Sequence, residues 1–401
     1  ENEDALTVTV PVQPVLSKQT ATLLEHMLGF YLRLAEQEGD APTISRKIAD
    51  ANQRVGDIHQ RLGHFDAGEK AYAQALALYG ELKERSPDSQ DICIEIARTC
   101  NQLGSMLVAR DRGGEAQEHF WLAVSTLQAQ PEAGRSSPEI QFELARTYFL
   151  LGRNPRPPVA PPPPNQPRPG QQPPGFPPRR SDGMPPPGES RLTRPGPMER
   201  RGDMRGRGES VRKAISILTE LGEAHADMPS HRHLLARCYR ELRRDRPGPF
   251  AAPSPDPRLQ AVEILERLVD DFPRVPEYRF DLSELYASLD EPGASDAEGA
   301  ERRMRVALRI MQELAGERPN VPRYVLSLAR MHHKLGDVLR RAGRQDDAEE
   351  AVRRAVTLQT SLLRRFPEVG PYAVGQAQYK ITLAELLFRQ DRLEEPRRLL
   401  E

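Results

Sequence analysis

The chain is poor in the residues and motifs that mark enzymes. Among its 401 residues there are one Trp and eleven Phe, which argues against a large aromatic cofactor pocket. There is no Gly-rich phosphate loop, no His-Glu-x-x-His, no Cys-x-x-Cys and no glycine-flanked nucleophilic Ser. We therefore expect a protein that is not an enzyme, with no catalytic residues, no cofactor and no small-molecule substrate.

Cysteine is equally sparse. Two of the three cysteines, Cys93 and Cys100, are seven residues apart on an expected helix. That spacing is about 10 Å at 1.5 Å per residue, whereas a disulfide needs Cα atoms within about 7 Å. One grouping of metal-binding residue types is His225, His231, His233 and Cys238. Two His at i and i+2 point in different directions on a helix, so we expect no metal site.

Long apolar runs are also missing. No stretch approaches the roughly 20 apolar residues that span a bilayer, and residues 1–4 (ENED) are unlike the start of a signal peptide. We expect no membrane span in this chain and a cytoplasmic location, and the extracytoplasmic side of a membrane-anchored parent stays open as the alternative. The missing initial Met leaves open that the chain is a fragment of a larger protein.

The chain does have a recurring pair pattern. An aliphatic residue followed directly by a small one occurs seven times, with the small residue at Gly56, Gly104, Ala145, Ala236, Ser283, Gly336 and Ala384. After each of the first six comes an Ala followed by an aliphatic residue, at Ala75, Ala123, Ala214, Ala261, Ala307 and Ala355. A small residue at a fixed helical position lets a second helix approach closely. The pattern therefore predicts helix pairs that stack into a solenoid.

The first full repeat shows the layout of a pair, which we call helix A and helix B. Apolar spacing predicts that helix A ends near Gly63 and that helix B begins near Asp66 and ends before Pro87. Gly63 is expected to cap the end of helix A, and Asp66 the start of helix B. The sixth repeat has the same layout at a 280-residue offset, with Gly343 for Gly63 and Pro367 for Pro87.

This register predicts units at 44–87, 88–131, 136–229, 230–273, 275–319, 321–367 and 370–401. Residues 1–14 are expected to be an extended lead-in, and residues 15–152 to hold an N-terminal capping helix and the first repeats. Residues 153–208 are expected to be a disordered insertion within the third repeat, and residues 209–401 the remaining repeats, the last one truncated. The predicted fold class is all-α, a superhelical solenoid of antiparallel helix pairs.

The pattern resembles the tetratricopeptide repeat (TPR). Tyr72, Phe120 and Ala348 stand where that motif expects them. The likeness covers nearly everything outside the lead-in and two insertions, and it implies a TPR-like solenoid that binds protein partners. The chain departs from the motif in two ways. Undisturbed steps are about 46–48 residues long instead of 34, and the position of the family's helix-A Trp holds Asn52 and His332.

Two segments, LLEHMLGFYLRLAEQEGD and RVGDIHQRLGHFDAGEKAYAQALALY, also resemble the repeat region of planctomycete-type bacterial signalling proteins. In those proteins the repeats follow a Ser/Thr kinase domain, so the resemblance implies the regulatory region of a larger kinase. The chain itself carries no kinase motif: no Gly-rich loop, no His-Arg-Asp and no Asp-Phe-Gly.

The predicted insertion is rich in Pro and Arg. There are eighteen Pro between Pro155 and Pro197, and residues 153–208 hold eleven Arg, no Lys and four acidic residues. Pro fixes φ and removes backbone donors, so we expect disorder or polyproline II here. A shorter insertion, residues 246–257, lies at the same turn of the fourth repeat. Candidate partner-binding residues in the long loop are Arg156, Arg179 and Arg180. A loop without a function of its own is the simpler interpretation.

The TPR resemblance implies that the A helices line the concave surface. The outward positions, counted from the small residue, are expected to be Arg98, Asn101, Arg146, Phe149, His233, Arg237 and Arg240. Guanidinium groups bind carboxylates through forked hydrogen bonds, so these residues are candidate contacts for an acidic partner. An ordinary mixed-charge face is the alternative. The Asn pair of the family's chaperone-binding clamps is not evident, because the matching sites hold Asp57 and Ser105.

Three functions are compatible with these features. The first is a non-catalytic protein–protein interaction scaffold, in a signalling or assembly complex, that binds other proteins or peptides, acidic ones among them. The second is the regulatory region of a larger kinase. The third is binding of RNA or acidic lipid through the Pro/Arg-rich loop, although nucleic acid is not the partner that we expect.

Overall fold

The computed structural model describes residues 18–35, 42–154, 197–224, 228–242, 256–289, 297–367 and 369–390. Within these ranges the chain is helical and contains no strand. The A helices are α2 (Pro42–Leu62), α4 (Gln90–Ala109), α7 (Pro138–Arg153), α9 (Pro229–Glu241), α11 (Pro276–Ser288), α13 (Pro322–Arg341) and α15 (Gly370–Arg389). The B helices are α3 (Phe65–Arg85), α5 (Gly113–Gln128), α8 (Pro197–Ala224), α10 (Pro257–Asp271), α12 (Ala297–Glu317) and α14 (Gln345–Arg365). The short α6 (Glu132–Arg135) lies between the second and third pairs, and α1 (Lys18–Ala35) packs on α2.

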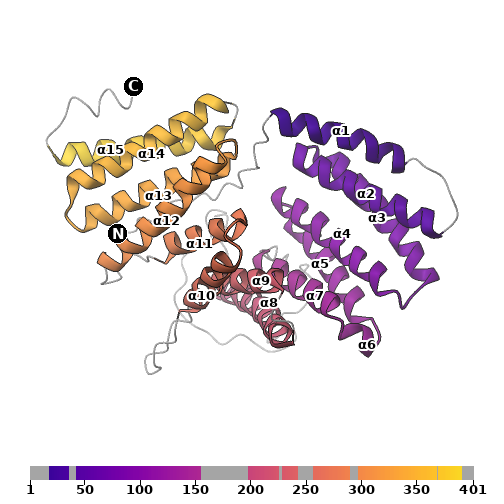
Figure 1. The fold of residues 1–401 in the computed structure, drawn as a ribbon. Helices are drawn as coiled ribbons and strands as arrows, with labels where there is room; N and C mark the ends of the chain where they lie inside the picture. The colour runs from indigo at the N-terminus through magenta and orange to yellow at the C-terminus, as the bar shows by residue number, and fades with distance from the viewer. Residues whose placement is uncertain are drawn as a thin grey trace, which may run out of the picture.

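The helix pairs follow one another around an arc, from α1 at one end to α15 at the other (Figure 1). Each A helix before α15 packs against its own B helix and against the next repeat, as in α13 with α14 and α4 with α7. In Figure 1, α9 and α11 lie nearer the inside of the arc than α8 and α10. The predicted solenoid of antiparallel helix pairs is confirmed.

Close approach at the small residues explains why the pairs form. An added Cβ at Gly56 would lie 2.6 Å from the Tyr72 ring, and one at Gly104 would lie 2.5 Å from the Phe120 ring. All six predicted alanines of the B helices are fully buried: Ala75, Ala123, Ala214, Ala261, Ala307 and Ala355. Small residues on both helices therefore bring the two backbones together, as the sequence pattern predicted.

Glycine in a left-handed conformation ends two of the A helices. Gly63 and Gly343 have φ of 80° and 78°, and this confirms Gly63 as the residue that ends α2. The residue after each donates to a carbonyl five positions earlier, as in His64 N–H to His59 O at 2.9 Å. Asp111 takes the same place after α4 with a φ of 60°. The prediction that Asp66 caps α3 is wrong, because α3 begins at Phe65 and its N-terminus has no side-chain cap.

Proline sets the step from one repeat to the next. Helices α3, α10, α12 and α14 each end two residues before a Pro, as the sequence predicted. Six A helices have Pro at their first or second position: α2, α7, α9, α11, α13 and α15. Pro has no N–H to donate, so it is tolerated at the start of a helix but not inside it.

The core runs through the array in pieces. One continuous buried cluster extends from Ala49 on α2 to Cys238 on α9. Smaller clusters then connect α9 to α11, α11 to α13 and α13 to α15. The helices therefore share no single core, because each repeat buries its apolar face against its neighbours.

Several predictions fall outside the described residues. These are the extended lead-in, most of the long insertion (residues 155–196), the shorter insertion apart from its last residues, and the end of the chain after residue 390. One difference is visible at the edge of the long insertion. Helix α8 begins at Pro197, whereas the sequence placed the start of this helix near Glu209. Its start at a Pro is typical of a first helical position.

Candidate functional site: the A-helix wall

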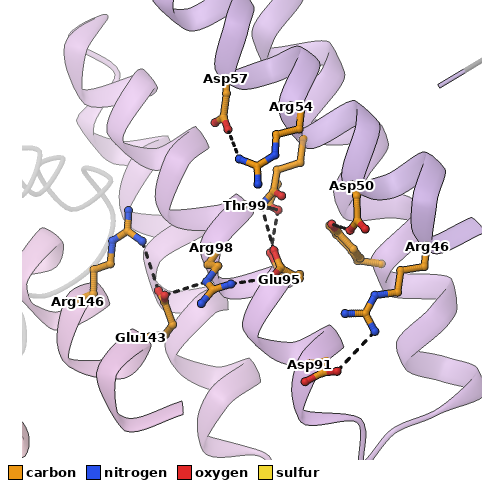
Figure 2. A network of polar contacts seen from close by, with 12 residues as sticks. Arg46, Asp50, Arg54, Asp57, Asp91, Glu95, Arg98, Thr99, Glu143 and Arg146 are labelled. Atoms are coloured by element: carbon orange, nitrogen blue, oxygen red, sulfur yellow. Dashed lines mark hydrogen bonds and ion pairs between the residues drawn. The ribbon is translucent and has the colours of Figure 1, made fainter. Parts of the chain in front are cut away.

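Charged side chains of α2, α4 and α7 lie close together across the first three A helices, and several of them pair (Figure 2). We call the side of the A helices that carries them the A-helix wall. Its outermost contact joins Arg46 on α2 to Asp91 on α4, with a nitrogen–oxygen distance of 3.6 Å. The next links Arg98 on α4 to Glu143 on α7 at 2.9 Å. Both contacts cross from one repeat to the next, so these charges join repeats.

Glu143 is the centre of this group. Its side chain is only 2% exposed, and it accepts a hydrogen bond from Arg98 Nε at 2.9 Å. Arg146 lies 3.6 Å from its other carboxylate oxygen. Burial by itself would lower the pKa of Arg98, but hydrogen bonds and charges from Glu143 and Glu95 outweigh it and raise that pKa. A buried carboxylate needs such partners, so both arginines are committed to it.

A second carboxylate organises the wall at α9 and α11. Asp281 on α11 lies 2.7 Å from Nε2 of His233 and 3.3 Å from a guanidinium nitrogen of Arg240. Burial would raise the pKa of Asp281, but its hydrogen bond with His233 and the nearby arginine charges bring it below its usual value. The two α9 side chains are therefore held against the next repeat.

Arg237 differs from these arginines. It is partly buried, and its guanidinium carbon lies 5.0 Å from the centre of the Phe149 ring. Arg153 lies over the same ring at 5.6 Å. Burial lowers the pKa of Arg237, and the charges of Arg240 and Arg153 lower it further against the opposing pull of Asp281 and Glu241. Within the described ranges, Arg237 has no hydrogen bond and no ion pair.

The seven predicted wall residues thus fall into three groups. Asn101 and Phe149 are each 1% exposed, so the prediction that they face outward is wrong. Asn101 is on the side of α4 that packs against α7, where its amide donates to Thr147 Oγ1 at 2.9 Å. Three arginines make ion pairs with carboxylates, and His233 makes a hydrogen bond with one: the arginines are Arg98, Arg146 and Arg240. Arg237 alone of the seven lies on the wall without a carboxylate partner.

Sequence reasoning missed the carboxylates that pair with these basic side chains. Glu143, Asp281 and Glu284 each face a basic residue of a neighbouring repeat. The sequence separations are 45 for Arg98 to Glu143, 48 for His233 to Asp281 and 46 for Glu284 to Arg330. These separations are close to the repeat length. Opposite charges about one repeat apart in the sequence are therefore the signal that could have suggested these pairs.

The three arginines predicted to act from the long loop, Arg156, Arg179 and Arg180, lie outside the described residues. The grouping around α9 is only partly described, because His225 also falls outside. His231 stacks on Phe142 with ring centres 4.8 Å apart, and Cys238 is fully buried. In the portion of the chain that the structure describes, no three His, Cys, Asp or Glu residues come together as metal ligands would. None of the described helices combines the length and apolarity needed to span a bilayer.

Two segments of the chain match the family model of the tetratricopeptide repeat, residues 49–81 and 329–361. The first matched segment runs from α2 into α3, and the second runs from α13 into α14. The 280-residue offset between the two matches equals the offset that the sequence showed between the first and sixth repeats.

The chain is also similar to several solved structures. A thermophilic TPR protein of Thermus thermophilus is 16% identical, with 73% of this chain and 99% of that chain covered and a TM-score of 0.33. The apo form of RapI is 10% identical over 94% and 95% of the two chains, with a TM-score of 0.42. A human IFIT1 dimer with PPP-AAAA is 12% identical over 95% and 77%, with a TM-score of 0.36. Among curated proteins, no sequence matches this chain.

Proposed function

We propose that this chain is a non-catalytic protein–protein interaction scaffold whose A-helix wall holds an acidic segment of a partner protein at Arg237. The observation that carries the proposal is the partly buried guanidinium over the Phe149 ring, for which no carboxylate partner is found in the described ranges. Solenoids of helix pairs usually present extended surfaces to partners, which supports the general role. A regulatory role beside a kinase, and polyanion binding by the long loop, stay predictions from sequence.

Charge around Arg237 favours one bound carboxylate. Three guanidinium groups, those of Arg153, Arg237 and Arg240, meet two carboxylates. Glu241 lies 3.5 Å from Arg153 and 3.9 Å from Arg240, and Asp281 holds Arg240 from the other side. These contacts leave an excess of one positive charge, centred on Arg237. A guanidinium offers five N–H donors, and the partly buried site strengthens a charge-assisted bond to an incoming carboxylate.

Arg237 is also held in place before a partner arrives. Its guanidinium lies over the ring of Phe149, a side chain that is only 1% exposed, and this contact restricts the arginine's conformations. A cation that is already ordered loses little side-chain entropy on binding, which favours affinity. The ion-paired arginines of α4 and α7 are less available to a partner, because an acidic segment would have to displace Glu143 from them.

The test is binding of a fluorescein-labelled octaglutamate peptide, followed by fluorescence anisotropy as the full chain is added. We expect binding that weakens as salt rises, because the contact is between charges near the surface. Arg237→Gln should weaken it by about tenfold or more, the usual loss for a charge-assisted hydrogen bond. The matched control is Arg267→Gln on the B helix α10, whose side chain is 71% exposed.

Thermal unfolding of both variants verifies that they are folded. Equal affinity of Arg237→Gln and wild type would show that the wall does not hold the peptide. Equal losses in Arg237→Gln and Arg267→Gln would show that only net charge matters. Either result would end the proposal.

A further inference from the structure

A groove opens on the B-helix side of the fifth and sixth repeats. Its walls are α12 and α14, its floor comes from α13, and its volume is about 300 Å³. Apolar side chains contribute to the floor, with Leu308 from α12 and Leu335 and Leu339 from α13. This volume is at the lower end for pockets that hold small ligands or single side chains. The groove shares no residue with the A-helix wall around Arg237.

Four arginines line the groove: Arg305, Arg309, Arg344 and Arg354. Arg305 and Arg344 both contact Glu301 at 2.6 Å, and Arg344 also contacts Asp347 at 2.6 Å. Arg354 pairs with Glu350 one turn earlier on α14. The exposed Arg309 has no ion pair or hydrogen bond within the described ranges. Four guanidinium groups therefore face three carboxylates, which leaves an excess of one positive charge.

His332 lies at the floor of this groove with an unused nitrogen. Its side chain is 4% exposed, and its buried Nδ1 atom has no hydrogen-bond partner. Burial, followed by the charge of Arg354, lowers the pKa of His332 to about 4. The imidazole is therefore neutral at physiological pH. A buried polar atom without a partner costs about 1–3 kcal/mol, so a ligand atom that satisfied Nδ1 would recover that cost.

The repeat itself does not require these residues. The position of His332 holds Asn52 in the first repeat, where the amide donates to Ile48 O at 3.0 Å. The positions of Arg305 and Arg309, two residues on either side of the buried Ala, hold Ala73 and Ala77 in α3. The first repeat therefore lacks this combination of basic walls over an unsatisfied polar floor.

We infer that the groove between α12 and α14 binds a carboxylate carried on an aliphatic group, as in an acidic residue beside Leu or in a C-terminal Leu. The aliphatic part packs on the leucines of the floor. The carboxylate lies between Arg309 and Arg354, and the His332 ring, in its Nδ1–H tautomer and turned so that this nitrogen faces the groove, donates the third hydrogen bond. A single carboxylate matches the single excess charge, whereas a phosphate dianion would leave the groove negative. This site is independent of the one at Arg237.

The probes are three short peptides built from Leu, Gly and one variable residue. The first has an internal Glu and an amidated C-terminus, and the second has Gln in its place with a free C-terminal carboxylate. The third has Gln and an amidated C-terminus and therefore no carboxylate. Binding to the full chain is measured by calorimetry and by ¹⁵N NMR of the histidine rings, with the His332 signal assigned from its loss in His332→Leu.

We expect one or both carboxylate peptides to bind and to shift the His332 ring signal, and the neutral peptide to leave it unchanged. The peptide that binds more tightly identifies the source of the carboxylate. Arg309→Glu should weaken binding by about tenfold or more, because repulsion replaces an ion pair. Arg302→Glu is the matched control, since it makes the same charge change on an exposed residue of α12 that does not line the groove. Arg237→Gln should leave this binding unchanged.

The His332→Leu variant separates a loss of carboxylate binding from a loss of folding. It removes a buried nitrogen that has no partner, so we expect the variant to be at least as stable as wild type while carboxylate binding falls about tenfold. The inference is overturned if neither carboxylate peptide binds. It is also overturned if the neutral peptide binds equally well, or if Arg309→Glu behaves like Arg302→Glu.

Discussion

The N-terminal repeats (α2–α5 and α7) and the C-terminal repeats (α11–α15) pair their helices alike but join successive repeats differently. Within a repeat the contact is the same. A Cβ added at Gly104 would come within 2.5 Å of Phe120, and one at Gly336 within 2.5 Å of Val352. Between repeats, the first half combines ion pairs, such as Arg98 to Glu143 at 2.9 Å, with buried neutral hydrogen bonds, such as Gln53 to Thr99 at 3.0 Å. In the second half, Arg330 contacts Glu284 in an ion pair whose arginine side chain is 46% exposed.

This comparison indicates that the fold depends on the small residues within each helix pair, whereas the polar contacts between successive repeats can differ. A buried amide–hydroxyl pair excludes water and fixes the register of two helices, since an unpaired group there is costly. An exposed ion pair adds little stability, because water and salt screen it. The second half also holds the basic groove and His332, whose Nδ1 atom has no hydrogen-bond partner among the described residues.

The largest effect on stability is expected at the close glycine contacts that both halves share. Gly104→Leu should lower the free energy of unfolding by about 3 kcal/mol or more, because the new side chain overlaps the Phe120 ring. Gly336→Leu should cost a similar amount against Val352. The control is Gly80→Ala, where nothing lies within 4 Å of the new Cβ. That change should stabilise by about 0.5–1 kcal/mol, because Gly is unfavourable inside a helix. Chemical denaturation measures all three, and unequal losses at the two close contacts would contradict the shared pairing.

A smaller effect, confined to the second half, is expected from His332. Its pKa in the folded state is about 4, below its usual 6.5, so the unfolded chain binds more protons between these values. Stability from the neutral imidazole is complete above pH 6.5 and is lost as pH falls toward 4, by about 2–3 kcal/mol. Hydrogen exchange of α13 amides at pH 7 and 4.5 measures this loss. His332→Leu should abolish most of it, and the prediction fails if that variant loses as much protection as wild type.

The smallest changes in the free energy of unfolding are expected at the contacts between repeats. The two contacts should differ mainly in how their contribution depends on salt. Asn101→Ala removes the buried bond to Thr147 and should cost about 2 kcal/mol, independent of salt. Arg330→Ala removes the exposed pair with Glu284 and should cost less than about 1 kcal/mol, with the cost shrinking further in high salt. Urea denaturation at two salt concentrations compares them. Equal costs, or salt dependence at Asn101, would show that the two contacts are not different in kind.

The fold was largely readable from sequence. Helix pairing follows from Gly56, Gly104 and the buried alanines, since a small residue at a helix contact lets the two backbones approach closely. The turn at Gly63 follows in the same way, because glycine tolerates a φ of 80° without strain. Helix ends were less certain. The start of α8 at Pro197 and that of α3 at Phe65 each differ from the prediction, because several nearby residues could serve as a first helical position.

The candidate site was readable only in part. Sequence placed Arg98, Arg146 and Arg240 on the A helices, but it could not show that Glu143 and Asp281 of neighbouring repeats already occupy them. Likewise, periodicity predicted that Asn101, Phe149 and Arg237 all face outward, although the stacking of repeats buries the first two. By itself the sequence determined the repeat, because close packing depends on residue size at fixed positions. Which charges remain unpaired was decided only by the tertiary structure, because pairing depends on contacts between residues about 46 positions apart.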